Sequence, residues 1–191
     1  SLKAHPEWSD QIVSFLWALD VTDIFRIQVI RNDKGLETVG ISHCFVNAKG
    51  TEAYGQTFMN ESLSLRRLIL IAVSFFEAFS KEKIIVIDDF GQLLHPYVLT
   101  HIVEIFHAND MESQLIVVDC NPALLQKDLM RKDSIWFAEK GEESSTEFVS
   151  LSDFRGIKAK QSIYDGYLQG IFGALPIESD FCFQNKVKEN N

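Results

Sequence analysis

The chain has 191 residues, of which 46% are hydrophobic and 24% charged, so it can form a folded core and is not collagen-like, coiled-coil or wholly disordered. Its 18 Lys and Arg residues against 27 Asp and Glu residues give a formal net charge of -9. Such a charge opposes contact with a phosphate backbone, and nucleic-acid binding by this chain is not expected.

Cysteine content and hydropathy give no sign of export or of a membrane span. The three cysteines, Cys44, Cys120 and Cys182, are odd in number and form no CxxC pair, so neither a disulfide framework nor a zinc site is indicated. The longest strongly apolar stretch, residues 68–79, is too short to cross a bilayer. A cytoplasmic location without a membrane partner is therefore expected.

Residues 1–59 predict a helix followed by an antiparallel β-meander. Apolar residues within 7–19 recur at helical spacing. From residue 25 to 58 the period changes to two, and turn sequences at 32–35 and 48–50 divide this stretch into three strands. We expect this segment to pack on the main domain.

Residues 60–178 predict an α/β domain. Apolar positions within 63–80 recur at three and four, as in a mostly buried helix. Three short runs are apolar at every position, which is typical of strands covered on both faces: residues 84–87, 115–118 and 135–138. A helix beginning near Pro96 separates the first two runs, so these two strands are expected to be parallel neighbours.

Two shorter predictions complete the chain. Residues 146–150 are expected to add an antiparallel strand after a turn at 141–145. Residues 179–191 are polar and charged at their end, and a frayed tail is expected there.

Paired acids give the first indication of function. Asp88 and Asp89 follow directly on the predicted strand 84–87, at the carboxyl end where α/β sheets bind ligands. In P-loop nucleotidases an acid at this place holds magnesium through water, and the next acid orients the attacking water. Many α/β proteins also end a strand with Asp on the solvent side, so the pair by itself equally allows a structural interpretation.

Several segments together resemble one protein family. In chain order they read ESLSLRRLILIA at 61–72, IIVIDDFGQLLHP at 84–96, QLIVVDCNPALL at 114–125, LMRKDSIWFAEK at 129–140, LSDF at 151–154 and YLQGIFGALP at 167–176. They resemble the C-terminal half of the ABC-type ATPases of overcoming-lysogenization-defect-like and abortive-infection phage-defence systems, described broadly as AAA-family ATP-binding proteins. The resemblance implies a P-loop NTPase-like fold with parallel central strands, and ATP and Mg²⁺ as cofactors.

The resemblance also implies roles for particular residues. Asp88 takes the place of the magnesium-binding aspartate of the Walker B motif, and Asp89 that of the catalytic glutamate. Cys120 takes the place of a switch histidine that senses the γ-phosphate. Four further residues fall in the signature and D-loop segments and are implied to contact nucleotide: Ser62, Ser64, Arg67 and His95.

The sequence departs from the family pattern at nearly every catalytic position. No GxxxxGK[ST] motif is present, so the chain lacks the backbone nest and the lysine that hold phosphates. Asp89 is one methylene shorter than glutamate, Cys120 offers a thiol instead of an imidazole, and Ser64 replaces the signature glycine. We therefore expect the isolated chain to bind no cofactor and to be inactive.

These features leave three interpretations. The preferred one is a catalytically degenerate ATPase-like module for nucleotide-dependent dimerisation or regulation, acting in phage defence beside a nuclease or another effector. The second is a fragment of an active ATPase, completed by an N-terminal lobe that carries Walker A. The third is a structural interaction module that binds no nucleotide. The implied partners are that lobe or a second copy of the chain.

Overall fold

A computed structural model describes residues 2–3, 5–31, 34–109, 112–126, 129–141, 143–155 and 162–176. It divides the chain into two compact units, Ser1–Leu124 and Leu125–Asn191. The tail expected at 179–191, and Cys182 within it, lie outside the described residues.

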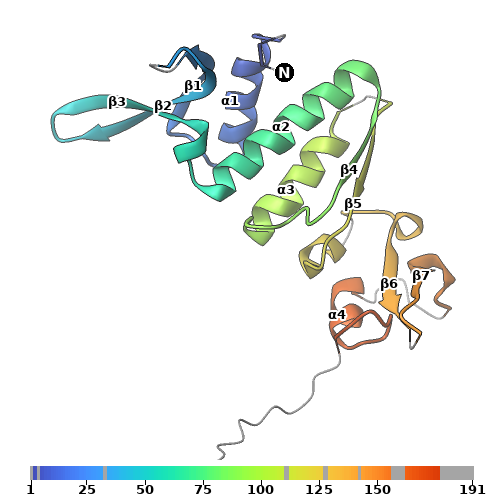
Figure 1. Cartoon of the computed structure of the whole chain (residues 1–191). Coiled ribbons are helices and arrows are strands. Elements are labelled where there is room, and N and C mark those ends of the chain that lie inside the picture. Colours follow the sequence, from blue (N-terminus) through green and yellow to red (C-terminus); the bar gives the residue numbers. More distant parts are fainter. Residues whose placement is uncertain are drawn as a thin grey trace, which may run out of the picture. The chain divides into compact units, whose positions relative to one another are not determined.

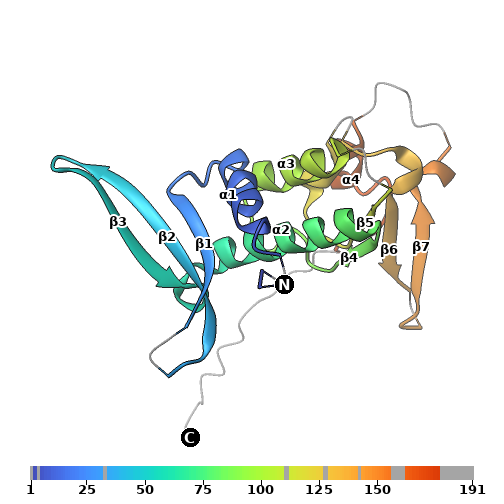
Figure 2. The ribbon, with the colours of Figure 1, turned by 90° about the horizontal axis from the view of Figure 1, so that it is seen from above.

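The first unit begins with a helix and a three-stranded antiparallel sheet, as the hydrophobic period predicts (Figure 1). Helix α1 (Trp8–Ala18) buries an apolar face that includes Ile12, Phe15 and Leu16. The strands β1 (Ile24–Arg31), β2 (Glu37–Asn47) and β3 (Gly50–Thr57) follow in the order β1-β2-β3. The β2–β3 hairpin extends beyond the part of the sheet nearest α1, as Figure 2 shows.

The register of this sheet places one apolar row against α1. Ile27 pairs with Ile41 across β1 and β2, and both side chains are almost completely buried. Because residues of a strand alternate between faces, neighbours such as Arg26 and Gln28 point to the other side and are exposed. The row fixes the register, since a slip by one residue would expose both isoleucines.

A short turn, η1 (Phe58–Asn60), leads from the sheet into the longest helix, α2 (Leu63–Lys81). Ser62 caps this helix, because its hydroxyl oxygen accepts a hydrogen bond from the Leu65 amide at 3.2 Å. Buried residues recur along α2 at the predicted spacing: Leu65, Leu68, Ile69, Ile71, Ala72, Phe75 and Ala78. The sequence-based expectation of a helix over 63–80 is confirmed.

A β-α-β unit completes the first unit. Strand β4 (Ile84–Ile87), helix α3 (Pro96–His107) and strand β5 (Gln114–Val117) follow one another, and β4 and β5 pair in parallel with Ile84 opposite Gln114. This confirms the predicted parallel neighbours. In Figure 1, α2 and α3 lie on the same side of the two strands. The short helix η2 (Pro122–Leu125) follows β5.

The outer face of the β4–β5 pair is open, and here the sequence-based expectation is wrong. Ile84 and Val86 are 63% and 66% exposed, and Ile116 is 43% exposed, whereas the residues between them are half-buried. The runs are apolar at every position, which is why burial on both faces was the natural prediction, but the helices cover one face only. Parallel strands are ordinarily covered on both faces, so this apolar surface needs an explanation.

The second unit is built around an antiparallel pair, β6 (Trp136–Lys140) and β7 (Thr146–Ser150), with η3 (Lys132–Ser134), η4 (Leu151–Asp153) and α4 (Ile163–Leu168). Its core contains Ile135, Phe137, Leu151 and Phe172. The strand expected at 146–150 is confirmed. The expectation that residues 135–138 form a strand covered on both faces is wrong, because Trp136 is 60% exposed.

The fold class is therefore α/β, as predicted, although the described parallel sheet has only the two strands β4 and β5. Among the described residues, no helix combines the length and the apolarity that a membrane crossing requires.

Candidate functional site

Asp88 and Asp89 are exposed in the turn of residues 88–93 that follows the carboxyl end of β4, whereas Phe90 of the same turn is completely buried. The Asp89 amide donates a hydrogen bond to the Asp88 carboxylate (N to Oδ1, 3.0 Å). Asp89 has a φ of 49°, in the left-handed region that Asp tolerates better than most residues. The turn therefore holds both carboxylates at the edge of the sheet with their outer oxygens free for other groups.

The end of β5 lies beside this turn because β4 and β5 are parallel. The Phe90 amide donates to the Val118 carbonyl oxygen at 3.1 Å. One carboxylate oxygen of Asp119 accepts a hydrogen bond from the Gly91 amide, and the other accepts from the Asn121 amide at 2.7 Å. Asp119 thus ties the two strand ends together.

Gly91 is required by this close approach. A Cβ atom built on Gly91 would lie 2.7 Å from the Asp119 Oδ2 atom and 2.8 Å from the Leu99 Cδ2 atom. Both distances are shorter than side-chain contacts allow, so the glycine lets the turn pack against the end of β5 and the start of α3.

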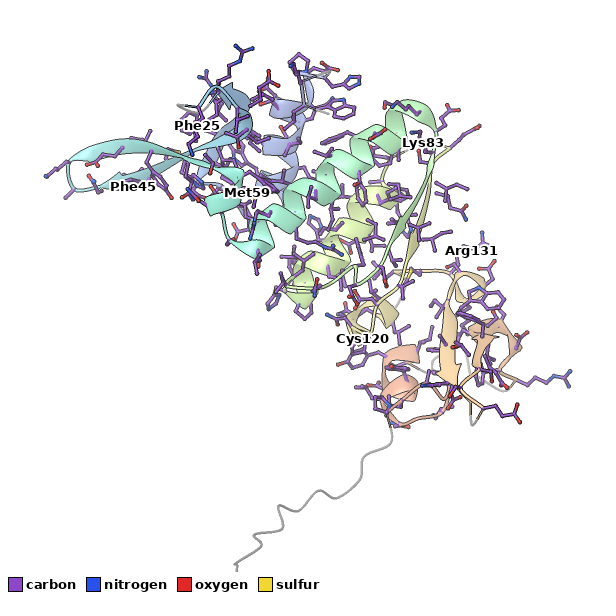
Figure 3. The ribbon with its side chains drawn as sticks, in the orientation of Figure 1. Phe25, Phe45, Met59, Lys83, Cys120 and Arg131 are labelled. Carbon is purple, nitrogen blue, oxygen red and sulfur yellow. The ribbon has the colours of Figure 1, made fainter. Side chains whose placement is uncertain are left out.

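Cys120 follows Asp119 and is exposed at the same edge of the sheet. Figure 3 shows it at the opposite end of the β4–β5 pair from Lys83, which precedes β4. Among the described residues, Cys120 forms no hydrogen bond with the acidic turn. Cys120 and the two aspartates therefore lie at neighbouring strand ends, as predicted, but their side chains form no hydrogen bond with one another among the described residues.

The first two turns of α2 contact the acidic turn directly. The Arg67 guanidinium donates from Nη2 to the carbonyl oxygens of Asp88 (2.9 Å) and Asp89 (2.7 Å). The Ser64 hydroxyl donates to the Leu93 carbonyl oxygen at 2.8 Å. Two sequence segments that the motif analysis singled out separately are thus one structural feature.

Arg66 and Arg67 each keep an unused donor in this region. Their Nε atoms are buried and have no hydrogen-bond partner among the described residues. Because an unpaired buried donor costs free energy, an incoming acceptor would be favoured there.

His95 has a structural role. It caps α3, because its Nδ1 atom accepts a hydrogen bond from the Tyr97 amide at 3.2 Å, and Pro96 occupies the first helical position. In this contact Nδ1 acts as a hydrogen-bond acceptor. The implied nucleotide contact of His95 remains a prediction.

The donor set for a metal is limited. No group of three or more His, Cys, Asp or Glu side chains that could hold a metal ion occurs in the part of the chain that the structure describes. Magnesium bound to a nucleotide typically takes one or two protein carboxylates and completes its shell with phosphate and water. Asp88 fits the role of one such carboxylate, whereas the phosphate nest would have to come from another segment.

Two side-chain clusters escaped the sequence analysis. Asp119 lies next to Cys120, and its Asx-type contact with the Asn121 amide is the local signal that could have revealed it. His43 contacts both Asp23 and Glu61, which are distant in sequence, so no spacing rule could have found that cluster.

The fold is α/β, and it is shared with an ATPase structure. The structure of this chain is similar to a solved chain from work on the structural biochemistry of ATP-driven dimerisation and DNA-stimulated activation of SMC ATPases. The TM-score is 0.55 at 13% sequence identity, and the match covers 78% of this chain and 86% of that chain. No protein-family model matches the sequence. No curated protein matches it either.

Proposed function

We propose that this chain is the signature-bearing half of an ABC-type ATPase-like module that works by nucleotide-dependent dimerisation or regulation of a partner, with a degenerate catalytic site. One observation carries the proposal. Arg67 and Ser64 of α2 are bonded to the acidic turn after β4, while the apolar outer face of β4 and β5 remains exposed. The contacts between α2 and the acidic turn form the proposed site, and the exposed strand face is the proposed surface for a complementary lobe.

The complementary lobe is a P-loop-bearing segment, from the parent chain or from a separate subunit. It would bring the Walker A loop, which the sequence lacks, and would cover Ile84, Val86 and Ile116. Parallel strands need such cover on both faces. In the assembled site Asp88 would give a carboxylate oxygen to nucleotide-bound Mg²⁺.

Catalysis in the assembled module would be weak for chemical reasons. Asp89 carries a carboxylate that reaches about 1 Å less far than glutamate, and such a displacement can cost about a hundredfold in rate. Cys120 has no imidazole to donate to the γ-phosphate. The Ser64 hydroxyl is already bonded within the chain to the Leu93 carbonyl.

The work on SMC ATPases describes ATP-driven dimerisation of those proteins. For this chain, the corresponding assembly is part of the proposal, with a second copy of the module as the mate. The motif resemblance of residues 61–176 supports a setting in phage defence, beside a nuclease or another effector, in the cytoplasm.

The test uses the chain together with a P-loop-bearing lobe and measures sedimentation with and without Mg²⁺ and a non-hydrolysable ATP analogue. Two chain–lobe modules are expected to dimerise only when nucleotide is present. A Walker A lysine variant of the lobe is the control, and modules that contain it should not dimerise. If the association state of the modules does not change with nucleotide, the result would instead support a structural interaction module.

A further inference from the structure

A buried histidine joins the β-meander to the beginning of α2. His43, on β2, is 4% exposed, and Glu61, immediately before the Ser62 cap, is 7% exposed. The His43 Nε2 atom lies 2.8 Å from the Glu61 Oε1 atom. The His43 Nδ1 atom lies 2.7 Å from the Asp23 Oδ2 atom, in the loop before β1.

The hydrogen-bond partners of this ring favour its charged form. An ionised carboxylate can only accept hydrogen bonds, so a ring nitrogen that contacts one must carry a proton. Both nitrogens of His43 contact a carboxylate, and both can be donors only when the ring is the imidazolium cation. With both acids ionised, these two contacts correspond to a protonated His43 ring.

The surroundings of the ring add one further titratable group. Tyr54 of β3 stacks on His43, with the ring centroids 4.8 Å apart and the planes inclined by 5°. Asp23, Glu61 and Tyr54 are thus the described groups that face the ring from the preceding loop, the start of α2 and the third strand. Burial lowers the pKa of His43, but the hydrogen bonds and charges of Asp23 and Glu61 outweigh it and raise that pKa above its usual value.

We propose that cationic His43 is a clamp that fastens the first turn of α2 to the β-meander through Glu61, so that protonation of one ring decides whether the two elements stay together. When the ring loses its proton, one nitrogen becomes an acceptor facing a carboxylate oxygen, and that contact turns repulsive. Glu61 is then a buried carboxylate next to a neutral ring. The free-energy cost of this unpaired buried charge is relieved when Glu61 moves away from the meander.

The consequence for nucleotide binding rests on the proposed function. Glu61 immediately precedes Ser62, and Ser64 is bonded to the acidic turn, so release of Glu61 would loosen the helix turn assigned to the partner nucleotide. His43 would then be a positioning residue, and movement of the β2–β3 hairpin would reach the nucleotide site through this ion pair.

The decisive test needs no variant and no nucleotide, so it stands apart from the test of the proposed function. Nitrogen NMR of the His43 ring in the full chain is followed from mildly acidic to mildly alkaline pH. We expect both ring nitrogens to be protonated at neutral pH. A neutral ring at that pH would overturn the clamp.

Amide hydrogen exchange then tests the coupling to α2. The Leu65 and Arg66 amides bond to the Ser62 side chain and carbonyl, so they report the first turn. Raising the pH through the His43 titration should increase their exchange, corrected for intrinsic rates, by about tenfold or more relative to amides in the middle of α2. An unchanged ratio would show that the ring titrates without controlling the helix.

Two substitutions sharpen this result. Glu61→Gln should lower the His43 pKa and speed exchange at Leu65 even at neutral pH, because the buried anion is gone. His101→Gln is the matched control, since His101 also contacts a carboxylate (Nδ1 to Glu104 Oε2, 2.8 Å) but on the exposed face of α3. The control should leave exchange at Leu65 unchanged, and an equal effect of both substitutions would contradict the proposal.

Discussion

The Gly91→Ala substitution probes the junction between the acidic turn and the end of β5. The new methyl group would lie 2.7 Å from the Asp119 Oδ2 atom and 2.8 Å from a Leu99 methyl carbon. Relief of the first contact moves the carboxylate that accepts the Gly91 amide hydrogen bond, and relief of the second disturbs a completely buried leucine. Overpacking and the weakened bond together should cost about 2–4 kcal/mol of unfolding free energy.

Chemical denaturation of the full chain, followed by tryptophan fluorescence, measures this loss. Gly55→Ala is the matched control, because a Cβ at Gly55 would meet only the Ile41 carbonyl oxygen at 3.7 Å, an ordinary contact. The control should stay within about 0.5 kcal/mol of wild type. A Gly91→Ala protein equally close to wild type would refute the close approach described for this turn.

A double-mutant cycle with Asp119→Ala locates the cause. When the carboxylate is absent, the methyl group of Gly91→Ala meets only Leu99, so the cost of the substitution should fall. The expected coupling between the two positions is about 1–2 kcal/mol. Strictly additive losses would show that Asp119 is not the group that requires glycine.

Arg67→Met removes both hydrogen bonds to the Asp88 and Asp89 carbonyls. It should cost about 2 kcal/mol of unfolding free energy in the same denaturation assay. A loss below about 0.5 kcal/mol would show that these contacts do not stabilise the fold. The contribution of His43 to stability should be fully present below the unfolded-state pKa and lost as pH rises through the raised folded-state pKa, so wild type and His43→Gln should converge in denaturation midpoint at alkaline pH. A gap that widens toward alkaline pH would reverse the sign and contradict the assignment. Val86→Ser should leave the unfolding free energy of the isolated chain within about 0.5 kcal/mol of wild type, because this side chain is exposed. It should weaken binding of the P-loop-bearing lobe by about tenfold or more in calorimetry. Unchanged affinity would show that the lobe does not bind this face.

Local patterns predicted the elements well. The change of hydrophobic period from helical spacing to two located the meander after α1, and the Pro96 position located the start of α3. The parallel pairing of β4 and β5 followed from their continuous apolar character and the helix between them. These are properties of short stretches of chain, which the sequence displays directly.

The cover of the strands could not be predicted in the same way. An apolar residue such as Val86 has the same sequence signal whether a helix of this chain or a partner buries it. The same ambiguity misled the prediction for residues 135–138, where Trp136 is exposed beside buried Phe137. Burial depends on what packs against a strand, and that is set by tertiary structure.

The candidate site was partly accessible to sequence reasoning. The motif resemblance brought α2 and the acidic turn to attention, but their direct bonding through Arg67 and Ser64 emerged only from the structure. The His43 contacts with Asp23 and Glu61 join three separate segments through side chains alone. No periodicity or turn residue encodes such a contact.

The proposed degeneracy of the catalytic site is testable by restoring the missing groups in the chain assembled with a P-loop-bearing lobe. Because groups that act on one transition state are not additive, Asp89→Glu alone and Cys120→His alone should each leave phosphate release near background. Both changes combined with Ser64→Gly should raise it measurably. Robust activity of either single variant would show that the site lacks only one group.

Steady-state phosphate release from the unmodified chain, assembled with a P-loop-bearing lobe and supplied with ATP and Mg²⁺, tests the central claim most directly. The blank is the same assembly with a Walker A lysine variant. A degenerate module predicts release equal to that blank, under conditions in which nucleotide still promotes dimerisation. Turnover clearly above the blank would contradict the account and establish that Asp89 and Cys120 suffice for an active ATPase.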